Sequence, residues 1–247
     1  NFDPANAGDA HSLLIDQTNV RGKTARMVYA PFDDVNTKAR IAIVGMTPGA
    51  FQAQKALNAA HDALRSGKSP EEAAHIAKVH ASFSGEPMRA NLIRMMDHVG
   101  IGRLLGLKST KGLWGADSHL VHFTSALRYP VFVDGKNWSG NPDMVRTPAL
   151  RTWLFAYTGA ELATLHDAFI VPLGPKVAAA MLHLAEQGLI DKNRIMDGMP
   201  HPSGANQERV ACFLGDKPAS ACSAKTNPQA IYAMRDALCR KVTRLAG

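Results

Sequence analysis

Apolar and polar positions along the chain follow two periods, one typical of strands and the other of helices. Short apolar or alternating segments predict four strands, at 41–44, 119–127, 168–173 and 195–196. Apolar residues at helical spacing predict helices at 52–64, 69–79, 89–99, 176–187 and 227–245. Strands that alternate with helices favour a parallel sheet covered on both faces. We therefore expect an α/β fold: a single domain spanning 1–247, with a central, mainly parallel four-stranded sheet flanked by helices.

Two local signals add detail to this pattern. Ser69-Pro70-Glu71-Glu72 combines a helix-capping serine with a glutamate at the third helical position, which predicts a capping box at the start of a helix. The segment 129–148 is rich in proline and glycine, and we expect it to form a long surface loop.

The composition is that of a globular chain with an excess of basic residues. Hydrophobic residues make up 46% of the 247, which argues against disorder. The formal net charge is +7 and the isoelectric point is near 9.5. Such a balance favours an acidic partner such as nucleic acid, although proteins of similar charge that never bind DNA are about as common.

The cysteines argue against disulfide and metal sites, and the hydropathy argues against a membrane-spanning segment. The three cysteines lie late in the chain without a Cys-x-x-Cys pair, so we expect no disulfide framework, no metal and no cofactor. No apolar run is long enough to span a bilayer, and the first residues lack signal-peptide character. These features predict a cytoplasmic protein that does not bind a membrane.

The first candidate for a functional site is Gly45-Met46-Thr47-Pro48-Gly49, which follows the first predicted strand and precedes a helix. Loops in this position lie at the carboxyl edge of a parallel sheet, where open α/β folds bind ligands. Glycines allow the backbone to approach a ligand closely. The alternative interpretation is a plain strand-to-helix turn.

The second candidate is the segment from Met199 to Asn206, which again follows a short predicted strand. His201 lies between two prolines, so its imidazole is held on an extended backbone rather than on a regular element. A histidine in this setting can donate a hydrogen bond to a developing oxyanion. A lone histidine in a loop is, however, more often simply solvated.

Together these segments resemble the two signature motifs of the uracil-DNA glycosylase superfamily. The first motif is similar to the Gly-x-Asn-Pro-Gly pattern of its single-strand-selective branch, and His201-Pro202-Ser203-Gly204-Ala205-Asn206 is similar to His-Pro-Ser-Pro-x-Asn. Ser82-Phe83-Ser84-Gly85 resembles a Phe-x-Gly stretch of the thermophilic-type branch. The segment 123–128 resembles the strand that ends in a base-reading asparagine in this superfamily. The segment 171–174 resembles the Leu-Gly end of the strand that lies between the two motifs.

The resemblance implies a role for each matching residue. His201 would stabilise the leaving uracil anion and Thr47 would position water, while Phe83 would stack on the flipped base, unless it is a core phenylalanine. The other residues expected to form the uracil pocket are Gly45, Met46, Pro48, Gly49 and Ser125. The residues expected to contact DNA are Ser203, Gly204, Asn206 and Gly174, with Arg128, Lys176 and Arg209 on phosphates.

Three positions depart from the family pattern. Thr47 stands where relatives carry Asp or Asn, and a threonine hydroxyl does not accept a proton from water near neutral pH. Glu86 and Asp117 are alternative acids, although each is typical of a solvated surface charge. Ser125 replaces the base-reading asparagine, and Ala205 replaces an apolar wedge, which favours single-stranded or mismatched DNA as the substrate. The three late cysteines do not match the four that hold an iron–sulfur cluster in the thermophilic-type branch.

The resemblance therefore predicts a monofunctional uracil-DNA glycosylase that acts in base excision repair, as a monomer, without metal or cofactor. A second hypothesis is a protein on the same scaffold that binds uracil-containing or abasic DNA without turnover. A third, a small-molecule hydrolase, is disfavoured because the sequence contains neither Gly-x-Ser-x-Gly nor His-Glu-x-x-His.

Overall fold

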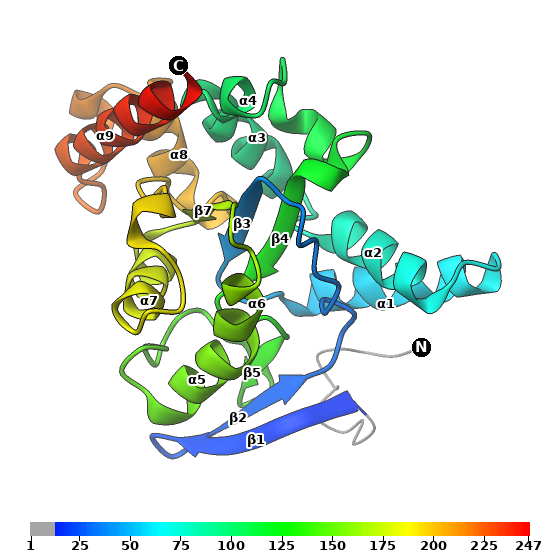
Figure 1. The fold of residues 1–247 in the computed structure, drawn as a ribbon. Helices are drawn as coiled ribbons and strands as arrows, with labels where there is room; N and C mark the ends of the chain where they lie inside the picture. Colours follow the sequence, from blue (N-terminus) through cyan, green and yellow to red (C-terminus); the bar gives the residue numbers. More distant parts are fainter. Residues whose placement is uncertain (1–12) are drawn as a thin grey trace.

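The computed structural model describes residues 13–247, and at its centre lie three parallel strands. They are β3 (Ile41–Gly45), β4 (Val121–Ser125) and β7 (Phe169–Pro172), in the order β4-β3-β7 (Figure 1). Every residue of β3 is buried, as expected for the central strand of a parallel sheet. Gly45 pairs with Ser125 and Val44 with Pro172, so the three carboxyl ends lie at one edge.

The expectation of a four-stranded parallel sheet is wrong in its strand count. The fourth segment makes two isolated parallel bridges to the β7 region, Ile170 with Ile195 and Leu173 with Met199. Gly198 has a φ of +124° and Pro200 has no backbone N–H, so a regular ladder cannot continue through this segment. The chain still runs parallel to β7 and reaches His201 at the same edge of the sheet.

A second sheet was not expected from the sequence. It is antiparallel and contains β1 (Leu14–Val20), β2 (Lys23–Val28), β5 (Val131–Val133) and β6 (Lys136–Asn137), in that order (Figure 1). The segment 129–148 is therefore not simply a surface loop. Its Trp138 is only 4% exposed and donates a hydrogen bond from Nε1 to the carbonyl of Pro142.

The predicted helices are confirmed, with their ends shifted by a few residues. The helices are α1 (Ala50–Arg65), α2 (Pro70–Ala81), α3 (Met88–His98), α4 (Ile101–Leu104), α5 (Pro148–Trp153), α6 (Ala160–Ala163), α7 (Pro175–Glu186), α8 (Gln207–Leu214) and α9 (Pro228–Ala246). A π-helical turn, Leu154–Gly159, joins α5 to α6, and short 3-10 turns occupy Thr110–Trp114, Ser118–Leu120, Lys192–Arg194, Gly204–Asn206 and Ala219–Ala221. The capping box of α2 is present, since Ser69 and Glu72 each accept a hydrogen bond from the other's backbone N–H.

The parallel sheet separates two apolar cores. Ile41 and Ile43 face a core formed with α3, α4, α8 and α9, whereas Ala42 and Val44 face a core formed with α5, α6, α7 and the second sheet. This alternation follows from the two-residue period of a strand. α1 and α2 pack on each other as a hairpin at the side of the sheet (Figure 1).

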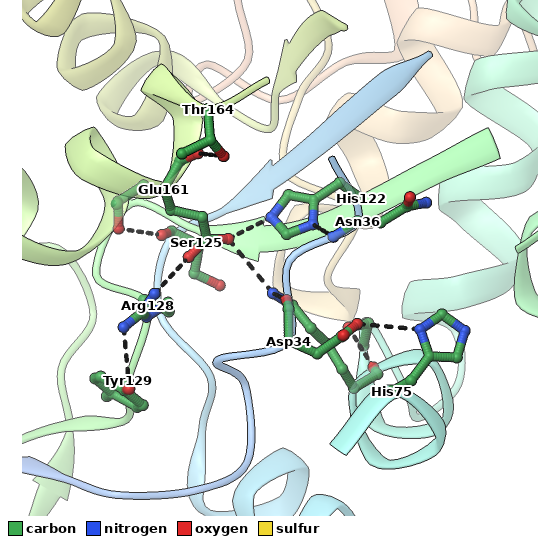
Figure 2. A network of polar contacts seen from close by, with 12 residues as sticks. Asp34, Asn36, His75, His122, Ser125, Arg128, Tyr129, Glu161 and Thr164 are labelled. Atoms are coloured by element: carbon green, nitrogen blue, oxygen red, sulfur yellow. Dashed lines mark hydrogen bonds and ion pairs between the residues drawn. The ribbon is translucent and has the colours of Figure 1, made fainter. Parts of the chain in front are cut away.

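A buried network of charged side chains ties these layers together. The carboxylate of Glu161 on α6 accepts hydrogen bonds from Lys78 on α2, from His122 on β4 and from Arg128 just after β4 (Figure 2). The side chains of Lys78, His122 and Glu161 are at most 3% exposed. Burial alone would raise the pKa of Glu161, but these basic partners lower it to about 2, so the carboxylate stays ionised.

His122 is held neutral within this network. Its Nδ1 accepts a hydrogen bond from the backbone N–H of Asn36, so the single ring proton of the neutral form lies on Nε2, facing Glu161. Burial, followed by the positive charge of Lys78, lowers the pKa of His122 below its usual value.

We expect the free energy of unfolding to fall as the pH drops below about 6.5. In this range a histidine in the unfolded chain binds a proton, whereas the buried His122 of the folded protein, with its lowered pKa, does not. His122→Gln should flatten this dependence, and His61→Gln, on an exposed side chain, should not. Urea unfolding at pH 7.5, 6.5 and 5.5 measures both slopes. Equal slopes for the His122 variant and the original protein would show that folding does not lower the pKa of His122.

Candidate functional site

The two motif loops meet in a cavity at the carboxyl edge of the parallel sheet. The cavity has a volume of about 80 Å³, which is several times the space that one buried water needs. It is lined by Phe32, Gly45, Met46, Thr47, Pro48, Gln52, Ala81, Ser82, Phe83, Met88, Phe123, Thr124, Ser125, Arg128 and His201. Segments more than 150 positions apart in the sequence therefore contribute to one site.

Most of the residues expected in the base pocket line this cavity. They are Gly45, Met46, Thr47, Pro48, Phe83, Ser125 and His201. Gly49 instead caps the start of α1, where its backbone N–H donates to the side chain of Gln52. Gly174 and Asn206 line an adjoining groove, and Gly204 packs near Pro87.

Phe83 and Gly45 fit closely against each other. A Cβ atom on Gly45 would lie 3.0 Å from Cε1 of Phe83 and 3.3 Å from Oγ of Ser125, so only glycine admits the ring at its present position. Phe83 has a φ of +50°, which is unusual for an aromatic residue and costs about 1–3 kcal/mol. Its ring contacts Phe123 edge-on, and Phe123 stacks on Trp114. A strained aromatic residue that lines a cavity is typical of a ligand-binding position.

His201 is a neutral hydrogen-bond donor. The backbone N–H of Ser203 donates to its Nδ1 at 3.3 Å, which places the ring proton of the neutral form on Nε2. Burial lowers the pKa of His201 below its usual value, so the ring is neutral at physiological pH. A neutral Nε2–H donor beside the cavity can bind a carbonyl oxygen or a developing oxyanion.

The loop that carries His201 is fixed by a buried amide on α3. Asn91, which is 3% exposed, donates from Nδ2 to the carbonyl of Pro202 at 3.0 Å and to the side chain of Gln207 at 2.8 Å. Ser203 accepts from Asn206 at 3.0 Å, so these two polar groups bind each other in the structure.

The Thr47 hydroxyl holds the second sheet against the first loop. It donates to the carbonyl of Tyr129 at 3.0 Å and accepts from the backbone N–H of Val131 at 3.2 Å. Its single proton is therefore committed, and one lone pair is left to orient water. Among the described residues that line the cavity there is no carboxylate, and neither Glu86 nor Asp117 lies there.

Arg128 and Thr124 give the cavity a polar region. Thr124 is 7% exposed, and its Oγ1 has no hydrogen-bond partner among the described residues. The side chain of Arg128, which was expected to contact a phosphate at the cleft, lines the cavity, is 15% exposed and binds Glu161. Its Nε is also buried without a partner among these residues.

A wider groove adjoins the cavity and shares Met46 and His201 with it. It has a volume of about 810 Å³. Its walls include the start of α7 at Gly174, Pro175 and Lys176, and parts of α8 and α9. The charged residues in its lining are Lys176, Arg209, Lys225 and Asp197. The excess of basic groups suits an anionic chain that reaches the cavity through this groove.

Sequence reasoning missed Lys78, His122 and Glu161, as well as the position of Thr124 in the cavity wall. His122 and Thr124 are polar residues inside a strand that is otherwise apolar, and this was the available signal for a buried polar network. Lys78 and Glu161 lie on helices, where charged residues are ordinarily solvated, so their burial became visible only in three dimensions.

Among residues 13–247 no group of three or more His, Cys, Asp or Glu side chains is arranged to hold a metal ion. In the same part of the chain no helix has both the length and the apolar character needed to cross a membrane.

Comparison with known proteins identifies a relative but no activity. No family model and no solved structure matches the chain significantly. The uncharacterized protein YoxB of Bacillus subtilis (strain 168) is 36% identical over 192 residues, which cover 76% of this chain and 75% of the relative. The chain therefore belongs to the same family as YoxB.

Proposed function

We propose that the protein is a monofunctional uracil-DNA glycosylase, a divergent member of that superfamily. The observation that carries the proposal is the joint position of Phe83 and His201 beside one cavity, at the carboxyl edge of the parallel sheet. A glycosylase needs an aromatic face for the flipped base and a donor for its carbonyl oxygen. Phe83 supplies the first requirement and the neutral Nε2–H of His201 the second.

The chemistry is hydrolysis of the bond between uracil N1 and the sugar C1′. The electron pair of this bond leaves with uracil, and negative charge grows on the ring and its O2 oxygen. Water forms the new bond to C1′ and loses a proton to the solvent, and the uracil anion takes up a proton after it leaves. Nε2–H of His201 stabilises the leaving anion, and removal of one such donor commonly costs a factor of about 10² to 10³ in rate.

The adjoining groove suits the DNA strand. Lys176, Arg209 and Lys225 line it, and Asp197 is the one acidic residue among the described residues of its lining. Because the groove shares His201 and Met46 with the cavity, a strand bound there would carry a flipped nucleotide to the base site. Uracil-containing DNA, single-stranded or mismatched, is the proposed partner.

A second candidate function is binding of uracil-containing or abasic DNA without turnover. It is favoured by the bonding of Thr47, whose proton is already donated to Tyr129, and by the lack of a carboxylate among the described cavity residues. With no strong base beside it, the water is activated only weakly. Cleavage kinetics therefore separate the two candidates.

We expect cleavage of a labelled single-stranded oligonucleotide that contains one uracil, measured after alkali treatment, and a loss of about 10² to 10³ in single-turnover rate for His201→Ala. His61→Ala, on an exposed histidine of α1, serves as the matched control and should leave the rate unchanged. Binding of the oligonucleotide without cleavage would select the second candidate. If the protein neither binds nor cleaves the oligonucleotide, both candidates are excluded.

We also expect the affinity for the same oligonucleotide to depend on salt through the groove. Lys225→Gln should weaken binding at 150 mM salt and reduce the slope of log K against log salt by about 0.7, the value for one lost contact with a single strand. Lys108→Gln, on an exposed lysine outside the groove lining, is the control. Equal slopes for both variants would show that the strand does not follow this groove.

A further inference from the structure

Two side chains that line the cavity each carry a buried polar atom that no described residue binds. The two atoms are Oγ1 of Thr124 and Nε of Arg128. A buried donor or acceptor without a partner destabilises the fold, and native proteins contain few of them. A molecule bound in the cavity, water or a ligand, can supply the partners that these two groups lack.

The orientation of the Arg128 guanidinium is fixed by hydrogen bonds and by contacts with aromatic rings. Nη1 donates to Glu161 at 3.1 Å and Nη2 donates to the hydroxyl of Tyr129 at 3.0 Å (Figure 2). The group also lies over the rings of Tyr129 and Tyr157, 4.8 and 5.4 Å from their centroids. Glu161 is in turn fixed by Lys78 and His122. Nε–H is therefore a donor of fixed position.

The chemistry of the two atoms limits the ligand. An arginine N–H donates and never accepts, so its partner must be an acceptor such as a carbonyl oxygen. A threonine hydroxyl can accept from a ring N–H. The Watson–Crick edge of uracil offers a carbonyl at O4 beside a donor at N3. Cytosine reverses both, with an amino donor at N4 and a lone pair at N3.

We propose that Arg128 and Thr124 are the specificity-determining residues of the cavity, reading the O4 and N3–H groups of uracil and rejecting the amino group of cytosine. This inference rests on the proposed function and deepens it. The pair takes over the discrimination that an asparagine would supply at Ser125, where one hydroxyl makes fewer contacts. Glu161 acts as a positioning residue, because it holds Arg128.

Thr124→Val tests the inference without a risk to the fold. Valine keeps the shape of threonine and removes only the hydroxyl, which has no partner among residues 13–247, so the stability of this variant should be equal to or greater than that of the original. Its preference for free uracil over free cytosine, measured by ligand-observed NMR titration, should fall about tenfold, as expected for one lost hydrogen bond.

Two further variants complete the experiment. Arg128→Lys keeps the charge but loses the fixed fork, and its preference for uracil should also fall about tenfold or more. Thr110→Val removes a buried hydroxyl that binds Asp97 at 2.8 Å, outside the cavity, so this variant should lose stability and keep its preference for uracil.

The outcomes separate this inference from the proposed activity. If the original protein prefers uracil and both cavity variants keep that preference, the inference is overturned while cleavage of uracil-containing DNA is untouched. If the preference falls in the variants but the original protein cleaves no uracil-containing DNA, the role of Arg128 and Thr124 in uracil recognition is supported and the proposed glycosylase activity is overturned. If the original protein binds neither base, the inference is overturned, and the cleavage assay decides the proposed function separately.

Discussion

The ionised carboxylate of Glu161 constrains the rest of the site, because a buried negative charge must have its partners close by. The protein supplies Lys78 from α2, His122 from β4 and Arg128 from the loop after β4. Two helices from distant parts of the sequence and the strand itself are thereby brought to one point. Arg128 carries this constraint to the cavity, since the same guanidinium that satisfies Glu161 also forms part of the cavity wall.

The part of the fold predicted from the sequence is the part with strong local signals. Buried strands such as 41–44 are continuous apolar runs, and the capping box at Ser69 is a spacing pattern of four residues. The relation between the Gly45 loop and His201 was also accessible, because parallel strands place their carboxyl ends at one edge. A sequence can therefore predict which loops lie next to each other, although no local pattern predicts the distances between their side chains.

The unpredicted part depends on contacts between distant segments. β2 pairs with β5, more than 100 positions further along, and neither is a long apolar run. Their pairing is a property of the assembled chain, and Thr47 takes part in it by binding Tyr129 and Val131. This contact gives the threonine a structural reason to stand where relatives of the proposed superfamily carry an acid or an amide.

The close fit of Gly45 against Phe83 has a consequence for how this family can vary. Any side chain at position 45 would occupy space that the phenyl ring fills, since even a Cβ would lie 3.0 Å from Cε1. Conversely, a smaller residue at position 83 would leave a gap behind the first loop. The two positions are therefore coupled through one contact: a side chain at position 45 requires the ring of Phe83 to shift by a few tenths of an ångström, so a substitution at either position changes what the other can accommodate.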